Sequence, residues 1–287
     1  SRTSLAAIGA IGTAGLVSSC SGKPKRKEVQ LPAFLTQAPD GKPIKAGLIG
    51  CGGRGTGAAV NFLDAGPNLQ ITALGDVFRD KLDQCREQLR KSKHSVEVAD
   101  ENCFIGFDAY QKVIDSGVDL VLLCTPPAFR PYHIEAAVNA GKHIFMEKPV
   151  AVDPVGARKV MISVKRAQEK GLCMVSGTIR RVQKDFAETW RRVASGEIGD
   201  IVSAHIIRNG GGLWIVQRQP GWTDMEYMLR NWANFCWLSG DHIVEQFIHE
   251  IDVMNWYIGK NPVKAMGWGG RQRRVTGDQY DFFSVEY

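Results

Sequence analysis

The chain has 287 residues with a formal charge of +6 at pH 7, and 44% of its residues are hydrophobic and 23% charged. This length and composition are typical of a globular enzyme or binding protein with two ordinary domains. Part of the positive charge lies in residues 23–27 (KPKRK), which we interpret as a solvated basic spacer. Because no zinc-ligand spacing or recognition helix accompanies it, we expect no nucleic-acid partner.

The chain opens with an apolar, uncharged stretch rich in small residues, 5–19 (LAAIGAIGTAGLVSS). This stretch is too short to span a bilayer comfortably and has the build of a signal-peptide core. It runs into LVSSC, which ends at Cys20 and resembles a bacterial lipobox. We therefore expect an exported bacterial protein, periplasmic or membrane-anchored through a lipid on Cys20, with a tether up to residue 42. A disordered tail is the alternative, and the choice between general and twin-arginine export stays open.

The six cysteines after Cys20 show no CxxC pair and no even spacing. Several of them lie in apolar runs, such as 121–124 (VLLC) and 171–175 (GLCMV). This pattern favours buried free thiols over disulfides, as in a protein that folds before export.

Residues 43–177 alternate between short apolar runs and helical patterns. Runs that are apolar throughout and alternate with helices predict a parallel sheet covered on both faces, in a doubly wound α/β (Rossmann) domain. The predicted strands are 44–49, 70–74, 103–105, 120–123, 143–145 and 173–175, and the predicted helices are 54–65, 79–92, 109–115, 131–140 and 153–170.

Residues 178–287 have a different pattern, with strand-like segments that no helix separates. We predict an α+β domain with a mainly antiparallel sheet for substrate binding or oligomerisation. Because the sequence stops inside an apparent strand, we expect this sheet to be incomplete at the C-terminus. The predicted elements are a helix at 182–195, an alternating strand at 200–207, a Gly- and Trp-rich region at 209–240, a helix at 241–258, and strands at 262–267 and 280–287.

A glycine-rich turn, GCGGRG at 50–55, follows the first predicted strand and opens the first helix. In this setting GxGxxG predicts a dinucleotide-binding turn. Gly50 would make the tight turn, Gly52 and Gly53 would admit the pyrophosphate, and Gly55 would pack the helix on the strand. The free amides of the helix N-terminus favour phosphate, and Arg54 could add a charged hydrogen bond.

An acidic residue is expected about twenty positions after this turn, at the end of the second strand. Asp76 lies 21 residues after Gly55. A carboxylate there would bind the ribose hydroxyls and repel a 2′-phosphate, so we expect NAD rather than NADP, although Arg79 could soften this preference. The alternative for Asp76 is an ordinary turn aspartate.

With this turn, two further motifs resemble the glucose–fructose oxidoreductase and inositol dehydrogenase (Gfo/Idh/MocA) family. They are CTPP at 124–127 and AGKHIFMEKP at 140–149. The resemblance runs from residue 44 to the end and implies NAD as cofactor. Because free NAD is scarce outside the cytoplasm, we expect an exported protein to keep it tightly bound. The resemblance also implies that Thr125 and Pro126 lie along the nicotinamide side, and that Glu147 and Lys148 contact the cofactor, with Lys148 beside the substrate hydroxyl. Without the surrounding motif, we would interpret Lys148 as a surface lysine paired with Glu147.

A second group of polar residues lies in the predicted helix 241–258. Glu245 and His249 are four residues apart and would share one helix face, with Asp252 near the same stripe. The family usually has Asp where this chain has Glu245, and the resemblance implies that His249 assists proton transfer. A metal pair and a surface salt-bridge stripe are alternatives, and we expect no metal.

Three further residues are substrate candidates. Trp232 belongs to a group of tryptophans that could stack on a sugar face or form an ordinary core or interface. Arg181 lies where the chain enters the second domain and could bind substrate, although a structural ion pair is favoured. His242 is the weaker histidine of the 241–258 region.

These observations predict an NAD-dependent oxidoreductase acting on a sugar, polyol or glycoside, with Lys148 and His249 taking the hydroxyl proton. An NAD-using glycoside hydrolase or lyase, acting by transient oxidation, elimination and re-reduction, is the first alternative. A non-catalytic sugar-binding lipoprotein is the second. The resemblance also implies a homo-oligomer.

Overall fold

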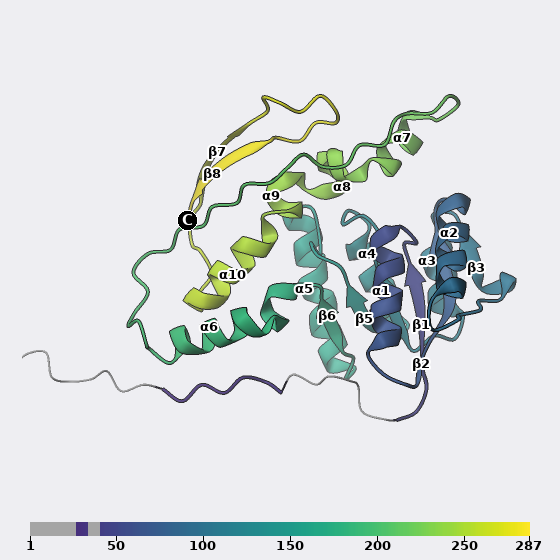
Figure 1. Cartoon of the computed structure of the whole chain (residues 1–287), viewed down its shortest axis with the longest axis horizontal. Helices are drawn as coiled ribbons and strands as arrows, with labels where there is room; N and C mark the ends of the chain where they lie inside the picture. Colours follow the sequence, from purple (N-terminus) through teal and green to yellow (C-terminus); the bar gives the residue numbers. More distant parts are fainter. Residues whose placement is uncertain (1–26, 34–40) are drawn as a thin grey trace, which may run out of the picture.

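The computed structural model describes residues 27–33 and 41–287 (Figure 1). The leader, Cys20 and most of the tether lie outside the described residues, so what we expect of them stays a prediction. Within the described ranges, no helix is both long enough and apolar enough to cross a bilayer.

A six-stranded parallel sheet forms the centre of residues 44–177, in the order β3-β2-β1-β4-β5-β6. The strand order reverses at β1, which lies between β2 and β4, and such sheets bind ligands beyond the carboxyl ends of their strands at this point. The predicted doubly wound sheet is confirmed. Its strands are β1 (Ile44–Ile49), β2 (Leu69–Asp76), β3 (Cys103–Ile105), β4 (Leu120–Leu123), β5 (His143–Met146) and β6 (Met174–Ser176).

Helices cover both faces of this sheet because its strands are apolar on both sides. In β4, Val121 and Leu123 belong to an apolar cluster with α3, α4 and α5, whereas Leu122 belongs to a second cluster with α1 and α2. Successive strand residues point to opposite faces, so the two clusters are the two sides of one core. The helices are α1 (Gly53–Asp64), α2 (Arg79–Lys91), α3 (Ala109–Asp115), α4 (Arg130–Asn139) and α5 (Pro154–Glu169).

Residues 178–287 contain short helices, an irregular stretch at 201–219 and one antiparallel hairpin, drawn in yellow in Figure 1. The predicted first helix and the two C-terminal strands are present, shifted by a few residues. The elements are α6 (Lys184–Ala194), α7 (Asp224–Arg230), α8 (Cys236–Ser239), α9 (Asp241–Glu245), α10 (Ile248–Ile258), β7 (Met266–Gly270) and β8 (Phe282–Glu286).

The predicted strand at 200–207 is wrong. These residues are not part of either sheet, and the Val202 side chain is 95% exposed. Alternating apolar residues predict a half-buried strand only where a neighbouring strand covers one face, and no described strand pairs with this segment.

The predicted single helix 241–258 is also wrong, since α9 and α10 are separated by Gln246 and Phe247. The main-chain carbonyl of Glu245 would accept from the N–H of His249 in a continuous helix. It instead accepts a hydrogen bond from the Lys148 side chain. A tertiary contact therefore occupies the acceptor at which the helix would have continued.

All six cysteines of the described residues are free thiols, as predicted. Burial is confirmed for Cys51 and Cys85, whereas Cys173 is exposed. The prediction of burial fails at Cys173 because the chain enters the short edge strand β6 there, which pairs with β5 on one side only.

Candidate functional site

The glycine turn after β1 is shaped by two close backbone approaches. Gly50 has a φ of +97°, and a Cβ atom there would lie 2.7 Å from the carbonyl carbon of Cys124. A Cβ atom on Gly55 would lie 1.8 Å from the Gly50 oxygen. Side chains would therefore block the turn and the packing of α1 on β1. A Cβ atom on Gly52 or Gly53 would meet nothing within 4 Å, so this side of the turn is open, as a phosphate-binding turn requires.

Asp76, at the end of β2, joins this turn to the next one. Its Oδ2 accepts from the Cys51 N–H at 2.7 Å, and its Oδ1 accepts from the Phe78 N–H at 2.8 Å. Burial raises the pKa of this carboxyl. Each carboxylate oxygen can accept more than one hydrogen bond, so Asp76 can brace the turn and still accept from a ribose hydroxyl. The contact with Phe78 is that of the turn aspartate given as the alternative, the contact with Cys51 was not predicted, and the ribose role stays a prediction.

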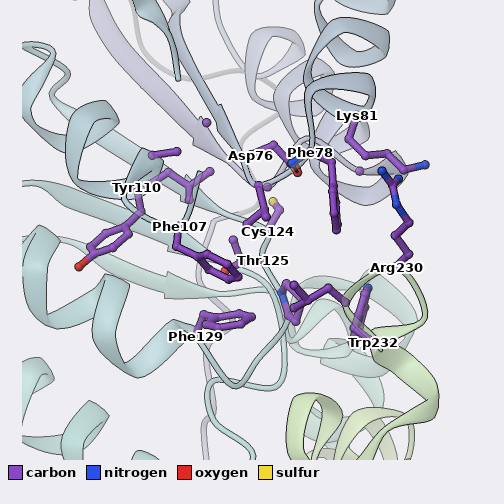
Figure 2. A pocket seen from close by; sticks show the side chains of 18 of the residues that line it. Asp76, Phe78, Lys81, Phe107, Tyr110, Cys124, Thr125, Phe129, Arg230 and Trp232 are labelled. Atoms are coloured by element: carbon purple, nitrogen blue, oxygen red, sulfur yellow. Dashed lines mark hydrogen bonds between the residues drawn. The ribbon is translucent and has the colours of Figure 1, made fainter. Parts of the chain in front are cut away.

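A cavity of about 370 Å³ opens in front of this turn, at the carboxyl ends of β1, β2 and β4 (Figure 2). Gly50, Asp76, Thr125 and Pro126, all predicted to bind cofactor, line it. The fit to a dinucleotide rests on these groups: an open glycine turn at a helix N-terminus with a carboxylate beside it. The opposite wall comes from the C-terminal region and consists of Trp214, Val216, Leu229, Arg230 and Trp232.

Trp232 thus lines the predicted cofactor cavity, facing the Rossmann side. Its ring packs edge-on against Trp214 at a centroid distance of 6.2 Å. The sequence left Trp232 open between stacking on a sugar and a core or interface role, and the structure shows it lining the same cavity as Asp76 and Thr125.

Lys148 lies in the loop after β5, and neither it nor Glu245 nor His249 is among the residues that line this cavity. The Lys148 Nζ is 2.8 Å from Oε1 of Glu245, and the two side chains are 14% and 7% exposed. The Gln246 amide donates to the other carboxylate oxygen of Glu245. A largely buried ion pair of this kind is costly to break because either charge would be left without its partner. It ties the Rossmann region to α9.

His249 is the third predicted catalytic residue, and the break between α9 and α10 removes the helix face that it was expected to share with Glu245. Burial, followed by the positive charge of Lys148, lowers the pKa of His249 below its ordinary value. This shift favours the neutral imidazole, the form that can accept a proton.

Arg54 and Glu147, both predicted to contact the cofactor, form an ion pair with each other at 2.9 Å. The Arg54 side chain is 54% exposed, and that of Glu147 is 14% exposed. The pair connects the first turn of α1 with the end of β5. Arg54 is therefore already engaged, and the sequence missed this partner because the two residues are remote along the chain.

Arg181 makes a bidentate ion pair with Asp252 of α10, at 2.9 and 2.8 Å. This is the structural ion pair that the sequence favoured. His242 packs edge-on against Phe247, lies 3.5 Å from Arg274, and lines a second hollow beside residues 201–213. Neither Arg181 nor His242 lines the cavity in front of the glycine turn.

Arg130 is a buried cation that sequence analysis did not single out. It is 2% exposed, and its guanidinium donates to the main-chain oxygens of Thr125, at 2.7 Å, and Pro149. Burial lowers its pKa to about 10. Arg130 joins the loops after β4 and β5, which carry the CTPP and EKP motifs. An arginine in the first turn of an apolar helix was the available signal.

No cluster of three or more His, Cys, Asp or Glu side chains within 27–33 and 41–287 could hold a metal ion. The described site offers a dinucleotide cavity, an ammonium held by a carboxylate, and an imidazole that favours its neutral form.

Comparison with known proteins agrees with this geometry. Residues 44–177 match the family described as "Oxidoreductase family, NAD-binding Rossmann fold" (GFO_IDH_MocA). The chain is 26% identical over 237 residues to scyllo-inositol 2-dehydrogenase (NAD(+)) of Bacillus subtilis, covering 83% of this chain and 60% of that protein.

Two further comparisons cover similar parts of the chain. Over 228 residues the chain is 25% identical to 2,7-anhydro-N-acetylneuraminate hydratase of Escherichia coli, covering 79% of this chain and 53% of that protein. The structure of scyllo-inositol dehydrogenase from Lactobacillus casei with bound NAD(H) and scyllo-inositol matches with a TM-score of 0.59 at 24% identity, covering 82% of this chain and 62% of that one. The chain therefore spans little more than half the length of these proteins.

Proposed function

We propose that the protein is an NAD-dependent oxidoreductase that oxidises a hydroxyl group of an inositol-like polyol or a sugar. The observation that carries the proposal is the largely buried Lys148–Glu245 ion pair, whose positive charge acts on His249. Reactive groups at the carboxyl end of a Rossmann sheet lie where a dinucleotide and its substrate meet. NAD binding by this domain is supported by the cavity and by the family match.

In this proposal Lys148 orients the substrate hydroxyl. An ammonium group has three N–H donors, and two of them are directed to the carboxylate and carbonyl of Glu245. The third can hold the hydroxyl oxygen. Glu245 fixes Nζ in place, so that the Lys148 ammonium holds the hydroxyl oxygen while His249 accepts the hydroxyl proton. When bound, NAD supplies the hydride acceptor at C4 of its nicotinamide.

Several features of the whole protein belong to the same proposal. The relatives named as inositol dehydrogenases favour a cyclic polyol as substrate. The apolar leader and Cys20 favour an exported, lipid-anchored protein. Since free NAD is scarce outside the cytoplasm, such a protein would keep its cofactor tightly bound, and it would act as a homo-oligomer.

A second candidate function is transient oxidation followed by elimination or hydration and return of the hydride. The relative named as a hydratase supports it. In that reaction Lys148 and His249 would have the same roles. No NADH would accumulate, because the hydride returns to the substrate.

The deciding experiment pairs Lys148→Met with Lys159→Met. Lys159 makes an ion pair with Glu135 at 2.7 Å on the outside of the domain, so it controls for the loss of a lysine. We expect Lys148→Met to lower polyol oxidation about 10²- to 10⁴-fold while NADH still binds, and Lys159→Met to leave both unchanged. Release of NAD(H) on denaturation tests the cofactor.

Other results would redirect the proposal. Retained turnover in Lys148→Met would remove this residue from the reaction. A protein that neither carries nor binds NAD(H) would favour a non-catalytic sugar-binding role. Cleavage of nitrophenyl glycosides without added NAD would favour the second candidate.

A further inference from the structure

One segment of the C-terminal region crosses over the cavity of the Rossmann domain. It comprises residues 214–234, which we call the strap, and includes α7. Its cavity-facing side chains lie opposite the glycine turn and Asp76 (Figure 2). A dinucleotide lying on the turn is therefore between the sheet edge and the strap.

The strap is held together by its own side chains. The buried Asn231 amide accepts from the Val216 N–H at 2.6 Å and donates to the Val216 oxygen at 2.9 Å. The Asn234 amide donates to the Trp214 oxygen at 3.0 Å. These bonds tie the extended start of the strap to the end of α7, so the strap can move as one unit.

Arg230 fastens the strap to the Rossmann domain. Its two terminal nitrogens lie 3.0 Å from the two carboxylate oxygens of Asp80 in α2. Its guanidinium also lies between two rings, 3.9 Å from the centroid of Phe78 and 4.7 Å from that of Trp222. Bidentate pairing and stacking on aromatic faces use the planar geometry that distinguishes arginine from lysine.

This fastening point adjoins the predicted cofactor-binding residues. The N–H of Phe78 donates to Asp76, and Asp80 lies one turn further along the chain. Release of Arg230 would therefore free the strap at the edge of the cavity beside Asp76.

We propose that the strap closes over the bound dinucleotide, and that opening of the Arg230 contact with Asp80 and Phe78 limits both entry and release of NAD(H). This inference rests on the proposed function in that NAD(H) is the ligand. The strap would retain the cofactor, because a ligand beneath it leaves only after the contact of Arg230 with Asp80 and Phe78 has opened.

The test is stopped-flow binding and release of NADH with the full chain, followed by tryptophan-excited fluorescence and displacement with excess NAD+. Arg230→Met removes the charge and keeps a long apolar side chain. Asp80→Asn removes only the acidic partner on the Rossmann domain, while Glu226 of the strap, 3.0 Å from Arg230, stays in place. Arg218→Met is the matched control, because Arg218 pairs with Asp224 at 2.7 Å and stacks over Tyr227 in the same strap without lining the cavity.

We expect Arg230→Met to accelerate NADH release about tenfold, and Asp80→Asn to accelerate it less, since the stacking on Phe78 remains. Association should accelerate as well, because one opening step limits both directions. Arg218→Met should behave as the unaltered chain. The Asp80 side chain is 58% exposed, so salt should speed release from the unaltered chain more than from Arg230→Met.

Unchanged release from Arg230→Met, with an unchanged circular dichroism spectrum, would overturn the inference. Faster release with unchanged association would also overturn it, since Arg230 would then be an ordinary contact and not a gate. If the unaltered chain binds no NADH, the proposed function fails together with the strap; if it binds and the variants do not differ from it, only the strap fails.

Discussion

The two regions of the molecule differ in how much of each is enclosed. Residues 44–177 form a sheet with a core on both faces. In 178–287, all of which the structure describes, the fully buried hydrophobic residues are only Ala187, Leu229, Ala233 and Leu238. Yet the second region supplies Glu245, His249 and the strap. The first region, 44–177, therefore provides a rigid frame, and we use that name for it below. The second region provides side chains that would act on the cofactor and substrate bound to this frame.

The glycine turn should be the least tolerant part of the frame. Gly55→Ala would place a methyl group 1.8 Å from the Gly50 oxygen, and we expect it to lower the free energy of unfolding by about 3 kcal/mol and to weaken NADH binding. Gly57→Ala is the control in the same helix, since its Cβ atom would approach only the Arg54 side chain, at 3.7 Å. It should gain about 0.5–1 kcal/mol from helix propensity.

Urea unfolding measures both variants. Equal stability of Gly55→Ala and the unaltered chain would mean that the turn adapts, and the frame would be less rigid than the structure indicates.

Low pH should lower the free energy of unfolding through His133, which lines the cavity and stacks on Tyr110. Burial, followed by the charge of Arg130, lowers the His133 pKa from 6.5 to about 4. The folded protein keeps the ring neutral while the unfolded chain binds a proton. The contribution of His133 to the free energy of unfolding is therefore complete above pH 6.5. It is lost, by on the order of 3 kcal/mol, as the pH falls to about 4.

His133→Phe keeps the stacking and removes the titration. Its free energy of unfolding should fall less between pH 7 and pH 4 than that of the unaltered chain. Equal losses in the two proteins would assign the acid sensitivity to other groups.

The junction between the regions should be energetically coupled. A double-mutant cycle of Lys148→Met and Glu245→Gln should give a coupling free energy of about 1–3 kcal/mol, because this pair is largely buried. The exposed pair Lys159–Glu135, 31% and 36% exposed, should give less than about 1 kcal/mol in the same urea experiment. Similar values for the two cycles would mean that the regions are held together elsewhere.

The smallest effect is expected in the segment 200–207. Val202→Thr should change the free energy of unfolding by no more than about 0.5 kcal/mol, since this side chain is 95% exposed. Val121→Thr, at a fully buried position of β4, should cost about 1–3 kcal/mol because it buries a hydroxyl group. A large loss for Val202→Thr would show that the segment is covered in solution and would reduce the contrast between the regions.

Sequence patterns predicted the frame well and the second region poorly. The six strands of the frame are apolar runs separated by helical patterns. Each predicted strand lies within a few residues of the observed one. The strand at 200–207 and the single helix at 241–258 failed for related reasons. The segment 200–207 has no neighbouring strand to pair with. The predicted helix is interrupted after Glu245, whose main-chain carbonyl accepts a hydrogen bond from the Lys148 side chain.

The sequence named candidate site residues one by one and did not name the pairs that they form. The structure brings Lys148 and Glu245 together and places the Lys148 charge near His249. The pairing of Arg54 with Glu147, the buried Arg130 and the cavity position of Trp232 were not predicted. Each depends on which chain segments meet, and no local pattern records that.

By itself the sequence determined the parallel sheet, the glycine turn and the acidic residue after β2, because periodicity, positive φ and motif spacing are local properties. The tertiary structure decided the contacts that give the site its chemistry. Lys148 and Glu245 are 97 residues apart, and Asp80 and Arg230 are 150 apart. Such pairs form only when the second region folds against the first, because charge and shape complementarity act through space and not along the chain.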